Sequence, residues 1–226
     1  MGNAGEPYWK FRKPKSDSKT IVNPVETDEF DSSKLGMQWQ WQNDYKESYG
    51  QATSMGFFRL FTYALPELGD VSNLWYVPNM LLQKIPADEF TATTKLSFCS
   101  RNSDQYVGLV CMSAEYSSVG LQRTEDGYEL QIRHNPNAMR THLTDEVLTV
   151  DTLKPTQKGT PRKGRPAEMH IKDVYLRMSI KDSKVNYAYS IDGKKWKKAG
   201  GEYAMGKGRW ICLLYTSDAA DDLIGV

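Results

Sequence analysis

Three carboxylates near the N-terminus, Asp28, Glu29 and Asp31, form the first group of side chains whose types suit acid–base chemistry. Catalysis by paired carboxylates needs two acids held on opposite sides of a substrate pocket. These three are close neighbours in the sequence and precede a predicted strand, where solvated acids are common. We therefore predict that they are not catalytic, and we identify no catalytic residue elsewhere in the chain.

Metal ligation has no sequence pattern to support it. The three histidines, His134, His142 and His170, are predicted in loops or at strand edges, and none has ligands at a regular spacing beside it. No serine lies in a nucleophile elbow, and no glycine-rich loop suits a phosphate. The sequence therefore predicts no metal site and no cofactor, and it gives no support for a structural calcium ion.

The three cysteines, Cys99, Cys111 and Cys212, are odd in number and lack the spacing of a metal site. Cys99 and Cys111 fall on two predicted strands that follow each other, with a turn expected near Asn102 and Ser103. Buried thiols are a common fate of free cysteines. We predict buried thiols here rather than a disulfide.

Aromatic residues offer a different chemistry, the stacking of rings on sugars. In 37 MQWQWQ 42 the alternation places Trp39 and Trp41 on one face and three glutamines on the other. Rings can stack on the C–H faces of a sugar while amides bond its hydroxyls. The alternative, which we favour, is that both tryptophans fill a core. Trp75 and Tyr76 lie in a predicted loop and are harder to explain as core, although a loop that caps the fold remains an alternative.

The elements that must position these side chains are β-strands, because almost every periodic segment alternates with period two. In 90 FTATTKLSF 98 one face carries Phe90, Ala92, Thr94, Leu96 and Phe98. The same alternation marks 174–180 and 185–191, and no helix is convincing. Further strands are predicted at 37–41, 57–62, 79–84, 106–112, 117–123, 128–133 and 146–150. Short antiparallel strands with regular turns predict an all-β, two-sheet sandwich.

Two Asp-Gly pairs mark the predicted hairpins. Asp126-Gly127 and Asp192-Gly193 each stand between alternating runs. Asp-Gly favours a tight hairpin turn because both central residues need positive φ. We therefore expect a two-residue turn at each pair.

Composition and charge exclude some classes of partner. The net charge is +1 with a pI near 7.6, and no apolar run is long enough to span a bilayer. The basic loop 154 KPTQKGTPRKGRP 166 has no interleaved aromatics, so we read it as solvated rather than as a nucleic-acid site. Neither nucleic acid nor membrane is a predicted partner. Residues 1–26 are rich in Pro, Lys and Ser, as in a linker, and lack the apolar core of a signal peptide.

A family resemblance rests on several motifs in a fixed order. They are 28 DEFDSSKLGMQWQW 41, 57 FFRLFT 62, 74 LWYVPNMLLQKIPADEFTATTKLSF 98, 106 YVGLVCM 112, 175 YLRMSI 180, 187 YAYSIDGKKW 196 and 203 YAMGKGRWI 211. Together they resemble the C-terminal domain of glycoside hydrolase family 43 enzymes, the β-xylosidases and α-L-arabinofuranosidases. The resemblance covers residues 27–211, and 5 GEPYWKFRKP 14 is similar to the junction that leaves the catalytic domain.

The resemblance implies a concanavalin A-like jelly roll packed on a five-bladed propeller that carries the catalytic carboxylates. No propeller lies in this chain, so it would be a fragment of a glycosidase without catalytic residues of its own. In this family the sandwich commonly lends an aromatic side chain to the rim of the propeller's pocket. The matching loop, 206–211, makes Trp210 the candidate, although packing at the sheet edge is an equal alternative.

The chain departs from the family pattern after Ile211. The string 212 CLLYTSDAAD 221 resembles the translation of a transposase sequencing adapter, so we read residues 212–226 as a non-native tail. On this reading the last strands of the sandwich are missing, along with the upstream propeller.

The sequence leaves two main functions open, and the fold alone also permits a third class, a laminin-G-like protein-interaction domain. The first is a non-catalytic accessory domain that packs on the propeller and helps shape its pocket for xylo- or arabino-oligosaccharides. The alternative is a free-standing, lectin-like carbohydrate-binding module. A parent enzyme of the first kind could be exported or periplasmic, and the sequence does not decide its localisation.

Overall fold

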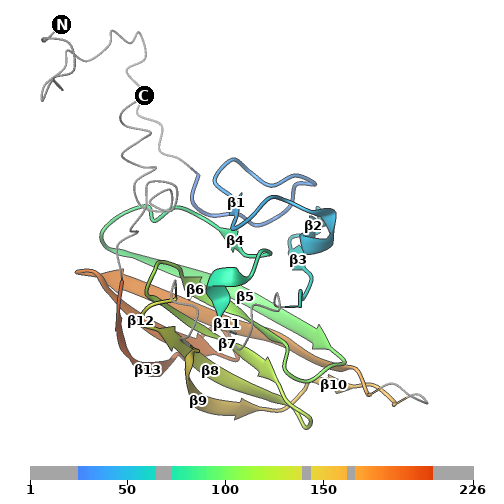
Figure 1. Cartoon of the computed structure of the whole chain (residues 1–226). Coiled ribbons are helices and arrows are strands. Elements are labelled where there is room, and N and C mark those ends of the chain that lie inside the picture. Colours follow the sequence, from blue (N-terminus) through green and yellow to red (C-terminus); the bar gives the residue numbers. More distant parts are fainter. Residues whose placement is uncertain (1–24, 65–72, 139–143, 162–165, 206–226) are drawn as a thin grey trace, which may run out of the picture.

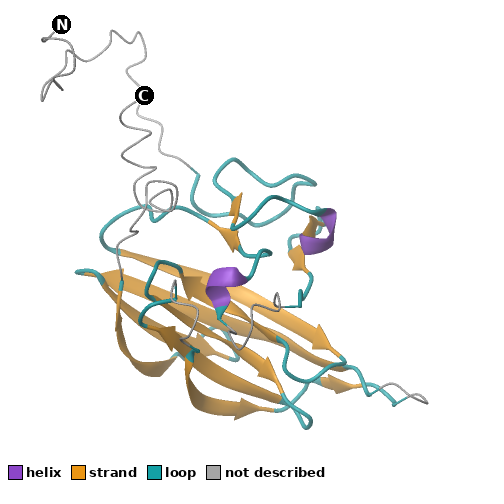
Figure 2. Cartoon of the chain, viewed as in Figure 1, coloured by secondary structure: helices purple, strands orange, loops and turns teal. Residues whose placement is uncertain are grey.

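The described part of the chain folds into two antiparallel β-sheets that face each other, with smaller strands at one side (Figures 1 and 2). The computed structural model describes residues 25–64, 73–138, 144–161 and 166–205. The predicted all-β, two-sheet antiparallel sandwich is confirmed. None of the helices in these residues is long and apolar enough to cross a membrane.

The first sheet is built around its longest strand, β11. Its members are β5 (Phe90–Ser100), β10 (Gln157–Lys158), β11 (Met169–Lys181), β12 (Lys184–Ser190) and β13 (Lys197–Ala204). β5 pairs with one edge of β11, and β10 and then β12 pair with the other edge. The register between β5 and β11 shifts between Ile171 and Val174, where Asp173 has φ 59°.

The second sheet is a meander in which each strand pairs with the next one along the chain. Its strands are β6 (Tyr106–Cys111), β7 (Tyr116–Arg123), β8 (Tyr128–Asn135) and β9 (Glu146–Leu153). β5 and β6 therefore lie in different sheets, and the segment near Asn102 and Ser103 connects the sheets instead of closing a hairpin.

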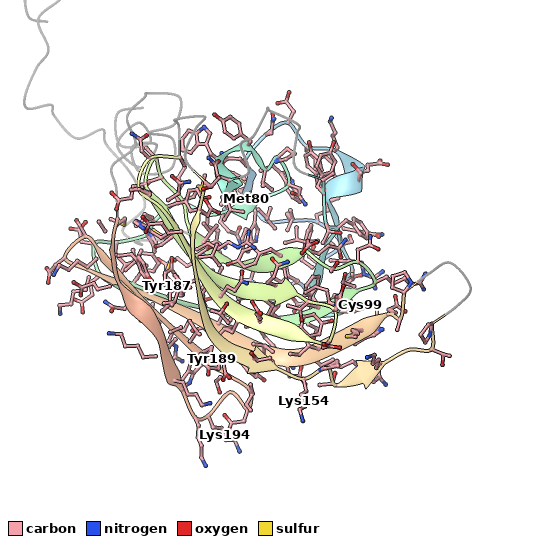
Figure 3. The ribbon with its side chains drawn as sticks, turned by 60° about the horizontal axis from the view of Figure 1, so that its bottom comes forward. Met80, Cys99, Lys154, Tyr187, Tyr189 and Lys194 are labelled. Atoms are coloured by element: carbon pink, nitrogen blue, oxygen red, sulfur yellow. The ribbon has the colours of Figure 1, made fainter. Side chains whose placement is uncertain are left out.

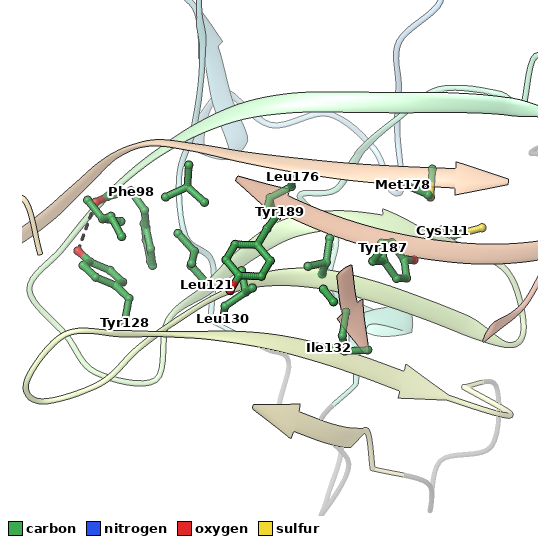
Figure 4. Packing of buried hydrophobic residues seen from close by; sticks show 14 of the residues in the cluster. Phe98, Cys111, Leu121, Tyr128, Leu130, Ile132, Leu176, Met178, Tyr187 and Tyr189 are labelled. Atoms are coloured by element: carbon green, nitrogen blue, oxygen red, sulfur yellow. Dashed lines mark hydrogen bonds between the residues drawn. The ribbon is translucent and has the colours of Figure 1, made fainter. Parts of the chain in front are cut away.

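The core lies between the two sheets, and period-two alternation produces it (Figure 4). Exposure alternates along β5 as predicted, with Phe98 buried and its neighbours outside. Leu121 and Leu130 of the second sheet and Leu176 of the first are all 0% exposed. The hydroxyl of Tyr128 donates to the carbonyl oxygen of Met169 at 2.7 Å, which satisfies this polar group inside the core.

The predicted hairpins exist, but the predicted turn type is wrong. Among the four residues of the two Asp-Gly pairs, only Gly193 has positive φ, at 70°. The connections are longer than two residues. In the first, the Thr124 N–H donates to the Gly127 carbonyl at 3.0 Å. The two-residue turn with positive φ is Asp182-Ser183, at 51° and 57°, between β11 and β12.

The N-terminal strands are shorter than predicted and form two separate pairs. β1 (Gln40–Trp41) pairs with β4 (Leu81–Leu82), and β2 (Gly50–Ala52) pairs with β3 (Phe58–Leu60). The 3-10 helices η1 (Glu47–Tyr49) and η2 (Leu74–Tyr76) are the helices of the described residues. We call residues 25–63 together with β4 the aromatic module.

No residue range was predicted for three short or irregular strands, although the Asp192-Gly193 hairpin implied a strand at the place of β13. β2 and β10 have two or three residues, too few for a periodic signal. β13 reads KKAGGEYA, with lysines and glycines in place of alternating apolar residues. It still contributes Ala199, which is 0% exposed, to the core. Tertiary packing therefore decides strand formation at these places.

Both described cysteines are free thiols, in agreement with the predicted absence of a disulfide between them. Cys111 is buried as predicted, and its burial raises the pKa of the thiol to about 12. The prediction of a buried thiol is wrong for Cys99, which is exposed. Cys99 alternates with the core residue Phe98 along β5, so its side chain points out of the sandwich.

Candidate functional site

The rings of the aromatic module pack against one another rather than against the main core. Trp41 in β1 lies with its ring centroid 5.6 Å from Tyr45, 5.8 Å from Tyr49 and 6.0 Å from Phe58. Tyr49 in turn meets Tyr63 edge-on at 5.4 Å. Tilted and edge-on pairs at these separations are the favoured geometries of aromatic rings. The module thus has a small apolar cluster of its own.

Asp28 fixes the second tryptophan of the module. One carboxylate oxygen accepts from the Trp39 indole N–H at 2.8 Å, and the other accepts from the Phe30 backbone N–H at 2.8 Å. The Trp39 ring stacks on Phe30 with centroids 5.4 Å apart. Asp28 was predicted as a solvated acid without catalytic function. The structure gives it a structural task, the orientation of an aromatic pair.

Trp39 and Trp41 do not share one face of a strand, as the predicted sugar-stacking surface required. Trp39 lies in a turn, since its N–H donates to the Gly36 carbonyl at 3.2 Å, and only Trp41 belongs to β1. Both tryptophans are half-buried and join one ring network through Phe30 and Phe58. They pack in the module and not in the core between the sheets, which differs from the favoured prediction. Sugar binding by them stays a prediction.

Most of the large apolar side chains that the described residues expose belong to the module. They are Val25, Met37, Tyr45, Met55, Phe57, Leu60, Phe61 and Tyr63. From residue 73 onward the same class contains Val147, Leu148 and Ile191. Met37 is 101% exposed and Met55 is 75% exposed. Large exposed apolar groups that gather in one region are typical of a protein interface.

Trp75 and Tyr76 form part of η2, which is fastened to the sandwich. The Asn73 side chain accepts from the Trp75 N–H at 3.0 Å and donates to the Ala138 carbonyl at 3.2 Å. The Leu74 N–H donates to the Tyr116 hydroxyl at 2.7 Å. These bonds hold Trp75 and Tyr76 half-buried beside β7. No ring contact within the described residues joins them to Trp39 or Trp41.

The Tyr116 hydroxyl, which accepts from Leu74, also belongs to a polar network with Asp145 and Asn135. The Tyr116 hydroxyl donates to the Asp145 carboxylate, and the Asn135 side-chain amide donates to the same oxygen at 3.0 Å. Burial, with the charge of Asp145 as a further cause, raises the pKa of Tyr116 far above its usual range. The hydroxyl therefore stays a neutral donor, and the network anchors the return of the chain from the module to the sandwich.

Polar residues on the outer face of the second sheet are paired with one another. The Arg133 guanidinium lies 4.0 Å from the Tyr106 ring centroid and donates to the Gln122 side chain at 2.5 Å and the Gln131 side chain at 3.3 Å. The Gln131 amide donates to Glu129 at 2.8 Å. These side chains thus bond mostly to one another, although Nε of Arg133 is buried without a hydrogen-bond partner.

A second cluster of reactive side chains gathers on the outer face of the first sheet. Cys99 Sγ lies 3.3 Å from Glu168 Oε1 and 3.4 Å from His170 Nε2. Arg101 Nε lies 3.6 Å from Glu168 Oε1. Partial desolvation of the sulfur by its neighbours and the nearby Glu168 carboxylate raise the pKa of the Cys99 thiol to about 11. In Figure 3, Cys99 lies at the end of the sandwich where β10 pairs with β11.

The two described histidines lie close to strand ends. His134 is the penultimate residue of β8 and His170 is the second residue of β11, which agrees with the predicted strand edges. His170 also has two side chains beside it that could bind a metal. Glu168 precedes it by only two positions, whereas Cys99 is distant in the sequence. The pairing of β5 with β11 could have revealed Cys99, but no sequence pattern gives that register. His142 lies outside the described residues.

Several predictions fall outside the described residues. They concern the pocket-rim candidate Trp210, the linker up to residue 24, the tail 212–226 and the missing last strands. Each stays a prediction.

Comparison with known proteins gives consistent matches. Residues 27–211 match the family described as the β-xylosidase C-terminal concanavalin A-like domain. The chain is 26% identical over 224 residues to a β-xylosidase of Formosa agariphila, with 91% of this chain and 34% of the relative covered. It spans about a third of the length of the curated relatives that it matches.

Solved structures share the fold. The GH43 BlXynB protein from Bacillus licheniformis superposes with a TM-score of 0.56 at 20% identity, covering 86% of this chain and 32% of that one. Xylan β-1,4-xylosidase from Bacillus halodurans superposes with a TM-score of 0.56 at 16% identity, covering 83% of this chain and 33% of that one.

Proposed function

Because the chain belongs to the family of β-xylosidase C-terminal concanavalin A-like domains, we propose that it is the accessory domain of a family 43 glycosidase. It has no chemistry of its own. It packs on the catalytic propeller of the parent enzyme and helps to shape the pocket that accepts xylo- or arabino-oligosaccharides.

The concentration of exposed apolar side chains on the aromatic module carries this proposal. The eight large apolar residues of the module would each remain in contact with water if the chain acted alone. Burying such surface contributes about 25 cal/mol per Å². We assign the catalytic domain as the occupant because the curated relatives are about three times as long as the part that this chain matches. If the catalytic domain is covalently linked to this chain, it is also present at a high effective concentration beside the module, which favours it over a separate protein.

Trp210 extends the proposal to the substrate pocket. In the family that the sequence resembles, an aromatic side chain from the matching loop reaches the pocket rim. We propose the same role for Trp210, with Trp39, Trp41, Trp75 and Tyr76 as structural aromatics. Replacing Trp210 by Ala should then raise KM for a short xyloside in the assembled enzyme while the association of the two domains is retained.

Association with the catalytic domain tests the proposal. The family 43 catalytic domain encoded with this chain is expressed as a separate polypeptide and mixed with the chain, and Kd is measured by calorimetry. The double variant Phe57→Ser/Phe61→Ser, on exposed residues of the module, should weaken binding by at least about tenfold, since two buried aromatic contacts are lost.

The matched control is Val147→Ser/Leu148→Ser, which changes two exposed apolar residues of the sandwich. It should leave Kd unchanged. The proposal fails if the gene encodes no catalytic domain with this chain, or if the purified domains do not associate. Binding of xylo-oligosaccharides by the chain alone, without the catalytic domain, would instead support the lectin-like module.

A further inference from the structure

The cluster on the outer face of the first sheet has the composition of a transition-metal site. Cys99, Glu168 and His170 each offer one ligand atom, and the three atoms lie within 4.8 Å of one another. Thiolate, imidazole and carboxylate are the three side-chain groups that zinc accepts in proteins. Three such groups with a fourth, open position are typical of zinc sites that keep a bound water.

The spacing of the ligand atoms matches a tetrahedral zinc ion. Zn–S bonds of about 2.3 Å and Zn–N and Zn–O bonds of about 2.0–2.2 Å place the ligand atoms of a tetrahedron roughly 3.3–3.6 Å apart. Cys99 Sγ lies 3.3 Å from Oε1 of Glu168 and 3.4 Å from Nε2 of His170, and Oε2 of Glu168 lies 3.7 Å from the same nitrogen. The two separations from the sulfur are close to the tetrahedral range, and a small rotation of the Glu168 carboxylate would bring one oxygen to the third position.

The backbone holds two of the ligands in place. Cys99 in β5 and His170 in β11 are direct cross-strand partners, so their side chains leave the sheet on the same face. On the other edge of β11, His170 pairs with Gln157, and the Thr156 N–H donates to the His170 carbonyl at 2.8 Å. Strand pairing on both sides fixes the position of His170, which lowers the ordering that binding would require.

The third ligand, Glu168, is held by a residue that is not itself a ligand, Arg101. Glu168 directly precedes β11, and its Oε1 lies 3.6 Å from the Arg101 guanidinium. An ion pair outside the ligand set can orient a ligating carboxylate. The side chains of Glu168 and His170 are 39% and 32% exposed, so the ion has access from solvent and water can take the fourth position.

We propose that Cys99, Glu168 and His170 bind one Zn²⁺ ion, with water as the fourth ligand. On binding, the Cys99 thiol loses its proton to solvent and a Zn–S bond forms, with no change of oxidation state. The thiolate and carboxylate charges together balance the charge of the ion. The ion joins β5 to the start of β11 and so stabilises the folded state over the unfolded one.

The other histidine with acidic neighbours does not form such a site. Glu115 lies 3.3 Å from Nε2 of His134, and Glu146 lies 3.0 Å from Nδ1. The two carboxylates therefore engage opposite nitrogens of the ring, and the three groups cannot converge on one ion. His134 serves as the matched control histidine.

Cobalt titration of the full chain tests the site. The Cys212→Ser variant is used as background, so that the tail thiol cannot bind the ion. One equivalent of Co²⁺ should produce a thiolate-to-cobalt charge-transfer band and tetrahedral ligand-field bands, and Zn²⁺ should displace both. One equivalent of Zn²⁺ should also protect Cys99 from alkylation and raise Tm.

Three variants locate the ligands. Cys99→Ser should remove the charge-transfer band, and His170→Ala should weaken metal affinity by more than about tenfold. His134→Gln should change neither. An unchanged Tm of the metal-free variants shows that they fold. The absence of saturable binding at submillimolar metal, or a charge-transfer band that persists in Cys99→Ser, would overturn the proposal. The site lies outside the aromatic module, so the result is independent of the proposed docking function.

Discussion

The sandwich and the aromatic module differ in how they bury apolar side chains. In the sandwich, strands of six to thirteen residues form the two faces of the core, and Leu121, Leu130 and Ile132 are at most 1% exposed. In the module, strands of two or three residues hold a small ring cluster, and large apolar side chains such as Met37 and Met55 stay in water. In the described residues the sandwich buries most of its large apolar side chains between the two sheets, whereas the module leaves eight of them exposed, which is typical of a surface that contacts another protein.

The largest expected effect is in the core of the sandwich. Leu130→Ala removes a side chain that is 0% exposed and leaves a cavity, so the free energy of unfolding should fall by about 2–5 kcal/mol. Urea unfolding monitored by far-UV circular dichroism measures this loss. Leu148→Ala, on a side chain that is 50% exposed, should change it by less than about 0.5 kcal/mol. Equal losses in the two variants would contradict the placement of the core.

Trp41→Ala tests whether the module is a separate cluster. The half-buried ring contacts three other rings, and its loss should destabilise the module by about 2 kcal/mol. Hydrogen exchange should accelerate in β1–β4 and leave the amides of β7 and β8 protected. If the global unfolding transition shifts as much as in Leu130→Ala, the two regions are one cooperative unit and the comparison is wrong.

Asp28→Asn should have a smaller effect, confined to the module. The substitution replaces a charged acceptor of the Trp39 indole N–H by a neutral one, at a cost of about 1 kcal/mol. The Trp39 indole proton should then exchange faster in NMR spectra. Asp31→Asn, at an exposed neighbouring carboxylate, is the control and should leave the exchange rate unchanged.

The smallest effect is expected at a hairpin end of the sandwich. The Asp192 carboxylate accepts from the backbone N–H groups of Lys195 and Lys194 at 2.7 Å and 2.8 Å, and from the Ser190 hydroxyl, which lowers its pKa to about 2. A lowered pKa adds stability above the unfolded value of about 3.9, and this contribution is lost as the pH falls through about 2. NMR titration of the Asp192 carboxyl carbon measures the pKa, and a value near 3.9 would refute these bonds.

The two regions also differ in how far the sequence predicts them. Strands of the sandwich such as β5 and β11 are long enough for period-two alternation to reveal them, and the family resemblance predicts their arrangement in two sheets. In the module the predicted strands at 37–41 and 57–62 shrink to β1 and β3, because contacts between rings rather than strand pairing hold these segments. Positive φ was predicted for all four residues of the Asp-Gly pairs, and Gly193 alone among them has it, because the connections are longer than two residues.

The candidate sites show a similar limit. The sequence shows which residues are aromatic. The hydrogen bond from the Trp39 indole to Asp28, however, depends on a turn that has no periodic signal in the sequence. The cluster of Cys99 and His170 depends on the register of two strands that lie far apart in the chain. Local patterns predict which face a side chain takes, and only the pairing of distant strands decides which side chains meet.

Hydrogen exchange of the chain, measured with and without the proposed catalytic partner domain, tests whether the aromatic module is a docking surface. We expect the added domain to slow exchange in residues 50–61, which contain the β2–β3 pair, its connecting segment and four of the exposed apolar residues of the module. Exchange in β9, which carries Val147 and Leu148, should be unchanged. Protection of β9 with no protection of residues 50–61 would contradict the assignment of the aromatic module as the docking surface.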